Sequence, residues 1–216
     1  MSTITIQSDL TPEDVSRLSQ SSYIAVDTET TGLKPTRDLL CLVQICDEND
    51  VVTVVKTRDW SACNGLREIL SNDNIIKVIH YALFDCGFLQ QNLGIEINNL
   101  YCTRTASKLA RTYSGSHSLK TVLSELLDVS LDKTQQTTFW CGDDLTDDQI
   151  AYASADVRYL IPLQLELNKI LEVKGKLPSG ISYVDLNSRC QQAIPTLVHL
   201  KLNGWEMPRD QSDWIF

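Results

Sequence analysis

Two acids follow a short apolar run near the N-terminus. In the stretch IAVDTETTGL, residues 24–33, three apolar residues lead into Asp27 and Glu29. Residues two apart on a strand share a face, so these two carboxylates are expected to lie side by side and to repel each other. Hard divalent cations bind carboxylate oxygens and would neutralise that repulsion. The pattern therefore predicts metal ligands at the end of a buried strand.

Two further acids and a tyrosine occupy positions that suit the same chemistry. Asp85 falls in the first turn of a helix that the sequence predicts over residues 82–93. Tyr152 and Asp156 are four residues apart, so they share one face of another predicted helix. Four converging acids suit two divalent cations about 3.5–4 Å apart, which can activate a water and stabilise the leaving oxygen of a phosphodiester.

Each of these residues also has an ordinary structural explanation. Asp27 and Glu29 fit a strand-end turn and an exposed surface position. Asp85 fits the favourable dipole at a helix N-terminus, and Tyr152 fits core packing. A buried carboxylate without a partner is costly, so the four acids taken together favour a metal-dependent catalytic site over four separate structural roles.

Three segments carry a family resemblance: VDTETTGL at 26–33, VIHYALFD at 78–85 and YASADVRYL at 152–160. They resemble the three exonuclease motifs of the DEDD superfamily, in the tyrosine-bearing branch that includes ribonuclease D and the proofreading domains of family A DNA polymerases. The resemblance implies a ribonuclease H-like fold and two Mg²⁺ or Mn²⁺ ions as cofactors. By that resemblance the metal ligands are Asp27, Glu29, Asp85 and Asp156, and Tyr152 orients the attacking water.

A closer resemblance covers residues 102–140, 26–45 and 195–205. These segments are similar to the nano-RNase C group, small RNase D-like bacterial enzymes. The similarity implies 3′–5′ exonuclease action on very short RNA, especially diribonucleotides, with nucleoside 5′-monophosphates as products. It also implies a homo-oligomer such as an octameric ring. The chain departs from the group at Phe139, where an acid usually precedes the tryptophan, and in the longer tail after Trp205.

Several residues near these motifs are candidates for holding the substrate. An apolar side chain at Leu33 could cover a base or wedge between two bases. Lys108 and Arg111 follow Arg104 at helical spacing, and this basic stripe could capture a 5′ phosphate. The predicted substrate-binding set is Thr28, Leu33, His80, Gln135, Lys108 and Arg111. The alternatives are a turn leucine, a strand-end histidine, a generic loop, and a solvated helix face or subunit contact.

Composition narrows the class of protein. The chain has 216 residues, 43% hydrophobic and 22% charged, which is ordinary for a globular protein. Its formal charge of −9 argues against binding of long duplexes but allows a short substrate whose phosphates are met by metal ions. The sequence contains no membrane-length apolar run and no signal-peptide pattern, so we expect no membrane association and a cytoplasmic location. Seven cysteines without a CxxC pair are expected to be reduced thiols.

The elements that must position these residues follow from hydrophobic periodicity. Strands are predicted at 22–27, 39–46, 51–55, 74–80 and 95–102, and helices at 10–20, 58–71, 82–93, 103–113, 118–128, 146–173 and 182–203. The expected fold class is α/β, a ribonuclease H-like mixed five-stranded sheet flanked by helices. We expect one exonuclease domain over residues 1–216, with a helical C-terminal extension from about residue 182 after a linker at 174–182.

Other functions remain open at this point. The same motifs would serve a general RNase D-like exonuclease on longer RNA or a proofreading-type DNA exonuclease. A non-catalytic nucleic-acid-binding or scaffold protein is a third alternative. The presence of all four acids and Tyr152 speaks against it, since a decayed site is expected to lose at least one.

Overall fold

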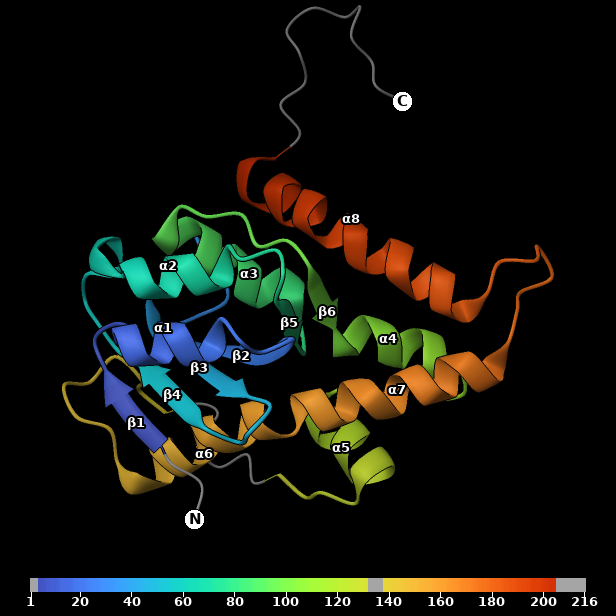
Figure 1. Cartoon of the computed structure of the whole chain (residues 1–216), viewed down its shortest axis with the longest axis horizontal. Helices are drawn as coiled ribbons and strands as arrows, with labels where there is room; N and C mark the ends of the chain where they lie inside the picture. Colours follow the sequence, from blue (N-terminus) through green and yellow to red (C-terminus); the bar gives the residue numbers. More distant parts are fainter. Residues whose placement is uncertain (1–3, 132–137, 205–216) are drawn as a thin grey trace, which may run out of the picture.

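A mixed sheet forms the centre of the computed structural model, which describes residues 4–131 and 138–204 (Figure 1). The strands are β1 (Ile4–Gln7), β2 (Tyr23–Thr30), β3 (Leu40–Asp47), β4 (Val52–Val55), β5 (Ile76–Ile79) and β6 (Leu100–Cys102). Their order across the sheet is β1-β4-β3-β2-β5-β6. Strand β3 is antiparallel to both of its neighbours, and the other pairs are parallel. The mixed sheet is therefore confirmed.

The predicted number of five strands is wrong, because β1 adds a sixth at the edge of the sheet. Three of the four residues of β1 are exposed. The sequence ITIQ consequently lacks the continuous apolar run that marks the inner strands. Its position is set by backbone pairing with β4 rather than by a strong pattern of its own.

The helices surround the sheet on both faces. They are α1 (Pro12–Leu18), the short 3₁₀ helix η1 (Trp60–Ala62), α2 (Asn64–Leu70), α3 (Ala82–Leu93), α4 (Thr103–Ala110), α5 (Leu119–Leu127), α6 (Asp147–Arg158), α7 (Leu160–Lys174) and α8 (Tyr183–Asn203). The single helix predicted over 146–173 is two helices that meet at Tyr159. Pro162 explains the break, since proline is tolerated in the first turn of a helix but not in its interior.

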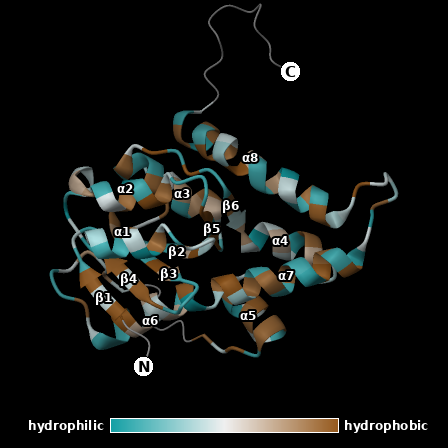
Figure 2. Ribbon diagram, in the orientation of Figure 1, coloured by the Kyte–Doolittle hydropathy of each residue, from teal (hydrophilic) through white to brown (hydrophobic). Residues whose placement is uncertain are grey.

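Alternate residues of the strands feed two separate cores. Val26 and Ile45 pack with the layer that contains α1, α2, α3 and α8. Ala25 and Cys46 pack with the layer that contains α4, α5, α6 and α7. Figure 2 shows hydrophobic colour along the strands between these two layers. The two faces of β2 thus look toward different helices, which decides what each of its polar residues can meet.

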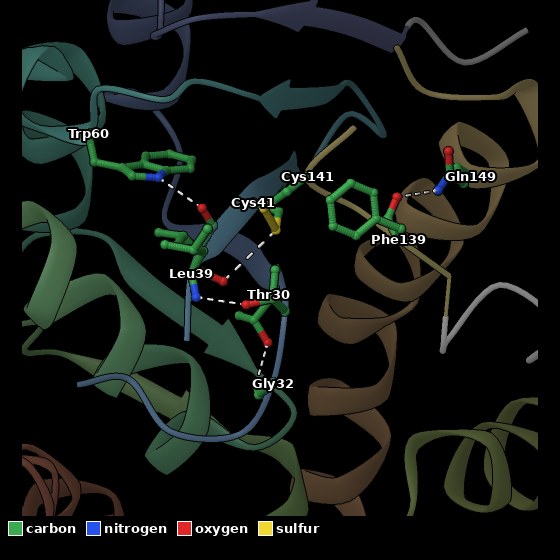
Figure 3. Close-up of a disulfide and its surroundings, with 10 residues drawn as sticks. Thr30, Gly32, Leu39, Cys41, Trp60, Phe139, Cys141 and Gln149 are labelled. Carbon is green, nitrogen blue, oxygen red and sulfur yellow. Dashed lines mark hydrogen bonds between the residues drawn. A yellow bond between two sulfur atoms is a disulfide. The ribbon is translucent and has the colours of Figure 1, made fainter. Parts of the chain in front are cut away.

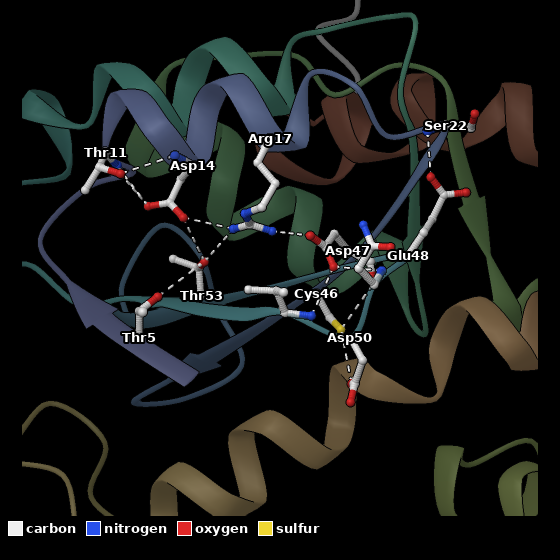
Figure 4. Close-up of polar contacts among 12 residues, drawn as sticks. Thr5, Thr11, Asp14, Arg17, Ser22, Cys46, Asp47, Glu48, Asp50 and Thr53 are labelled. Atoms are coloured by element: carbon white, nitrogen blue, oxygen red, sulfur yellow. Dashed lines mark hydrogen bonds and ion pairs between the residues drawn. The ribbon is translucent and has the colours of Figure 1, made fainter. Parts of the chain in front are cut away.

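A polar network fixes α1 to the β3–β4 hairpin (Figure 4). Arg17 forms ion pairs with Asp14 and with the buried carboxylate of Asp47, and it donates a hydrogen bond to Thr53 Oγ1 at 3.2 Å. Burial alone would raise the pKa of Asp14, but hydrogen bonds from Gln7, Arg17 and Thr11 outweigh it and lower that pKa to about 2. The network therefore holds the hairpin beside β2, the strand that carries the first motif.

The prediction that all cysteines are reduced is wrong for one pair. Cys41 and Cys141 form a disulfide with a Cα–Cα distance of 4.9 Å (Figure 3). The two residues are 100 positions apart in sequence, and only the fold brings the start of β3 next to the segment before α6. The other five cysteines are free.

None of the helices within residues 4–131 and 138–204 combines the length and the apolar character that a bilayer crossing requires.

Candidate active site

A cleft of about 620 Å³ opens where β2 ends. Its lining brings together all five residues predicted to act in catalysis: Asp27, Glu29, Asp85, Tyr152 and Asp156. They come from β2, α3 and α6, elements that are distant in sequence. The fold therefore creates one place where the motif residues can act together.

Three of the carboxylates form a tight group. Oxygen atoms of Asp27, Glu29 and Asp156 all lie within 4.8 Å of one another. Asp27 and Glu29 project from the same face of β2, and α6 packs across that face. Three oxygen donors at this spacing fit a hard divalent cation.

Asp85 reaches the cleft from the other side of the sheet. It is buried in the first turn of α3, and its Oδ1 accepts a 2.7 Å hydrogen bond from Thr28 Oγ1. Because Thr28 lies between Asp27 and Glu29 on β2, its side chain points to the opposite face, toward α3. Strand β2 therefore presents Asp27 and Glu29 to α6 and fixes Asp85 through Thr28.

The start of α6 is fixed to the cleft wall. Thr146 and Gln149 form a capping box, in which each side chain accepts from the other residue's backbone N–H. The buried Gln149 side chain also donates to the carbonyl of Phe139 at 3.3 Å. Figure 3 shows this bond beside the Cys41–Cys141 disulfide. The helix that carries Tyr152 and Asp156 is thus tied to the segment that lines the cleft.

The crowded acids have strongly raised pKa values. Burial raises the pKa of Asp27 well above its usual range, and Asp85, Asp156 and Glu29 raise it further. Burial, followed by the charges of Asp156 and Asp85, raises the pKa of Glu29 to about 9. Burial also raises the pKa of Asp85 to about 7, against the opposing effect of the Thr28 hydrogen bond. Without a cation the site therefore retains protons at neutral pH, and a bound cation would replace them.

Tyr152 stays a neutral phenol under the same conditions. Burial and then the charges of Asp156 and Glu29 raise the pKa of Tyr152 far above its ordinary value. The ring packs on the buried Trp140, with centroids 5.8 Å apart. A protonated, positioned hydroxyl can orient a water by hydrogen bonding, but it cannot remove a proton as a phenolate base at pH 7.

Apolar and aromatic side chains flank the acids. Leu33 lines the cleft with 75% of its surface exposed, and Phe139 lines it with 71% exposed. Tyr81 also lines the cleft, and the Arg104 guanidinium lies 4.3 Å from the centre of its ring. Exposed aromatic faces and a nearby guanidinium are suitable surfaces for bases and phosphates.

Two of the predicted substrate contacts have internal partners. Thr28 lines the cleft, but its buried hydroxyl donates to Asp85, so its side chain supports an acid. His80 lines the cleft, but its Nδ1 lies 2.9 Å from Thr103 Oγ1 and its Nε2 lies 3.1 Å from the carbonyl of His117. His80 therefore links β5, α4 and the segment before α5.

The predicted basic stripe is not continuous. Helix α4 ends at Ala110, and Arg111 turns inward, where it is fully buried. Its guanidinium pairs with Glu125 and donates to the carbonyl of Ser116 at 3.0 Å, so the assignment of Arg111 to the substrate is wrong. Lys108 is exposed but is not among the described lining residues, and Gln135 lies outside the described residues.

One lining residue, Tyr81, was missed from the sequence, and its neighbour Arg104 was named there only as part of the basic stripe. Strand β5 ends at Ile79 and β6 ends at Cys102, and both run parallel to β2. The residues just after parallel strands meet at one edge of a sheet, the edge where ligands bind in open α/β sheets. That topological signal could have identified Tyr81 and could have separated Arg104 from the rest of the basic stripe.

Comparison with known proteins gives the family. A family model described as 3′-5′ exonuclease matches residues 2–172. Ribonuclease D of Desulfotalea psychrophila is 30% identical over 171 residues, which is 77% of this chain and 46% of that protein. The chain thus spans less than half the length of this curated relative.

Solved structures match over the full length of both chains. Brucella melitensis NrnC, a nano-RNase C, superposes with a TM-score of 0.86 at 34% identity, covering 99% of this chain and 100% of its own. Structures of the same protein bound to pGG and with bound Mg²⁺ each match with a TM-score of 0.85. The chain belongs to the 3′–5′ exonuclease family, as an RNase D-like member of the nano-RNase C type.

Proposed function

We propose that this protein is a divalent-metal-dependent 3′–5′ exoribonuclease that hydrolyses short RNA, above all diribonucleotides, to nucleoside 5′-monophosphates. The observation that carries the proposal is the meeting of four carboxylates and one neutral tyrosine in a single cleft. Membership of the 3′–5′ exonuclease family supports the reaction class.

The donor set fits two Mg²⁺ or Mn²⁺ ions. All four candidate ligands offer carboxylate oxygens, the donor type that hard divalent cations prefer. Asp27, Glu29 and Asp156 would hold one ion, and Asp85 would contribute to a second. When bound, the ions would activate a water and neutralise charge at the phosphodiester. The Mg²⁺-bound NrnC structure supports this choice of cofactor.

The protein's own groups would then direct the reaction. The Tyr152 hydroxyl, which stays protonated beside Asp156, would orient the attacking water toward phosphorus. A new bond forms between the water oxygen and phosphorus, and the bond from phosphorus to the preceding 3′ oxygen breaks. The attacking water gives up one proton to solvent, the 3′ oxygen takes one up, and the released nucleotide keeps its 5′ phosphate. Leu33 and Phe139, the exposed apolar residues of the cleft lining, would hold bases.

The charge distribution favours a short substrate. Proteins that bind long polyanions depend on many lysine and arginine contacts to phosphates. Among the described lining residues, Arg104 is the one lysine or arginine, and the whole chain carries a formal charge of −9. The NrnC structure bound to pGG supports a dinucleotide as the ligand size.

Assembly and location are part of the same proposal. We infer a homo-oligomer such as an octameric ring, for which exposed Leu165, Val173, Val184 and Leu197 on α7 and α8 offer apolar contact surface. Light scattering would test the oligomeric state. A cytoplasmic location stays a prediction from the sequence, and the Cys41–Cys141 disulfide is an observation against it, because disulfides are rare in reducing compartments.

A length series tests the proposal. 5′-Labelled RNAs from two to about twenty nucleotides, digested with Mg²⁺ or Mn²⁺, should show the fastest turnover for the dinucleotide, because a short substrate needs few phosphate contacts. The double variant Asp27→Ala with Glu29→Ala is the inactive control. Equal or better turnover of long RNA would instead indicate a general RNase D-like enzyme, and a preference for DNA would indicate a proofreading-type exonuclease.

A further inference from the structure

One buried amide under the active site has no hydrogen-bond partner. Gln44 lies in the middle of β3 and is fully buried. Neither its Nε2 nor its Oε1 has a partner among the described residues. Buried polar groups in native proteins are nearly always satisfied, because an unpaired one loses its hydration without compensation. The position therefore requires an explanation beyond packing.

The strand register places Gln44 beside a candidate metal ligand. Gln44 is directly opposite Asp27 in the antiparallel β2–β3 ladder. Side chains of directly opposite residues project to the same face, with Cβ atoms about 4.5–5.5 Å apart. The two side chains are thus adjacent on the face of the sheet that α6 covers.

The other neighbours of Gln44 within the sheet are apolar. Across the β3–β4 ladder it is directly opposite Val54, and along its own strand the residues on the same face are Leu42 and Cys46. All three are buried in the core beneath α6 and α7. A methionine or leucine would suit these surroundings better than an amide, so Gln44 is a poor choice for core stability alone. Asp27 is the cross-strand neighbour that an amide could serve.

We propose that Gln44 is a positioning residue for Asp27. In the metal-bound state its Nε2–H donates to the Asp27 carboxylate oxygen, directly or through one buried water, and holds that carboxylate in the orientation that ligates the ion. The inference rests on the proposed metal-dependent function. Groups that hydrogen-bond to metal ligands typically change metal affinity or activity by about 10–100-fold.

The variant Gln44→Met separates this role from a structural one. It keeps the side-chain length and removes both polar atoms. We expect the protein in chelator to melt at the same temperature or higher, because an unpaired buried amide is gone. We expect Mn²⁺ binding, measured by titration calorimetry, to weaken by about 10–100-fold. Activity at saturating Mn²⁺ should approach that of the wild type, since all four carboxylates remain.

The chain offers a matched control. Gln164 on α7 is also buried, its Oε1 also lacks a partner, and it is not among the described residues of the cleft. Gln164→Met should change the melting temperature without changing Mn²⁺ affinity. Wild-type Mn²⁺ affinity in folded Gln44→Met would overturn the proposal. If that variant does not fold, Gln44→Asn, which withdraws the amide by one carbon, carries the test, and unchanged affinity again overturns it.

Failure of the proposed function would look different. In that case the wild-type protein itself would bind no Mn²⁺ in the calorimeter and would cleave no RNA, whatever residue occupies position 44.

Discussion

The protonation of the acid cluster predicts how stability depends on pH when metal is absent. The folded-state pKa of Glu29 is about 9 and that of Asp85 about 7, whereas the ordinary values are near 4. At pH values between the ordinary and the folded-state pKa values, the folded protein binds more protons than the unfolded chain. The contribution of these groups is therefore fully present below the ordinary pKa and is lost as the pH rises through about 7 and then about 9.

The size of the effect follows from the number of retained protons. Each retained proton changes the free energy of unfolding by about 1.4 kcal/mol per pH unit. The two protons on Glu29 and Asp85 would thus give a slope of about 3 kcal/mol per pH unit between roughly pH 5 and 7, and Asp27, whose pKa is also raised, would add to it. Above the pKa of Asp85, near pH 7, the slope from Glu29 and Asp27 should remain.

Denaturant unfolding in excess chelator, at several pH values from 5 to about 9, measures this slope. The matched control is the double variant Asp27→Asn with Glu29→Gln, which keeps the shape of both side chains and removes their titration. Stability of the wild type should fall with pH relative to this variant, and Mn²⁺ should abolish the fall by replacing the protons. Parallel pH curves for the two proteins in chelator would refute the reasoning.

Three further predictions concern single features of the structure. Tyr152→Phe should slow the chemical step by about 10²–10⁴-fold with little change in substrate affinity, and an unaltered single-turnover rate would show that the ring only packs on Trp140. Cys41→Ala with Cys141→Ala should lower the free energy of unfolding by up to about 4.7 kcal/mol, the chain-entropy value for a loop of this length, and a urea midpoint equal to that of the oxidised wild type would contradict it. Arg104→Ala should weaken dinucleotide binding, whereas Arg111→Ala should lower the melting temperature by breaking its pair with Glu125. If a binding titration shows weaker binding for Arg111→Ala and not for Arg104→Ala, the predicted role of the basic stripe in phosphate binding is supported instead.

The sequence was informative where the relevant geometry is local. The two-residue spacing of Asp27 and Glu29 and the four-residue spacing of Tyr152 and Asp156 each correspond to a fixed distance on a strand or a helix. These residues accordingly line one cleft. Asp85 follows the same principle, because the first turn after a buried strand lies at the edge of the sheet.

The predictions from sequence were wrong or incomplete where the position of a side chain depends on the whole fold. Arg111 continues the helical spacing of Arg104, but α4 ends one residue earlier, and Glu125 supplies a partner that no local pattern indicates. Cys41 and Cys141 meet only after β3 and the segment before α6 have packed together. The link from Thr28 to Asp85 and the register of Gln44 opposite Asp27 likewise depend on strand and helix pairings that a single sequence does not contain.

The most direct test of the account is the digestion of one short RNA, labelled at its 5′ end, with Mn²⁺ or with excess chelator. The account predicts stepwise release of nucleoside 5′-monophosphates from the 3′ end with Mn²⁺. It predicts no cleavage in chelator and none by the Asp27→Ala, Glu29→Ala double variant, because both conditions remove the ion from the four-carboxylate cleft. Full activity in excess chelator, or release from the 5′ end, would contradict it.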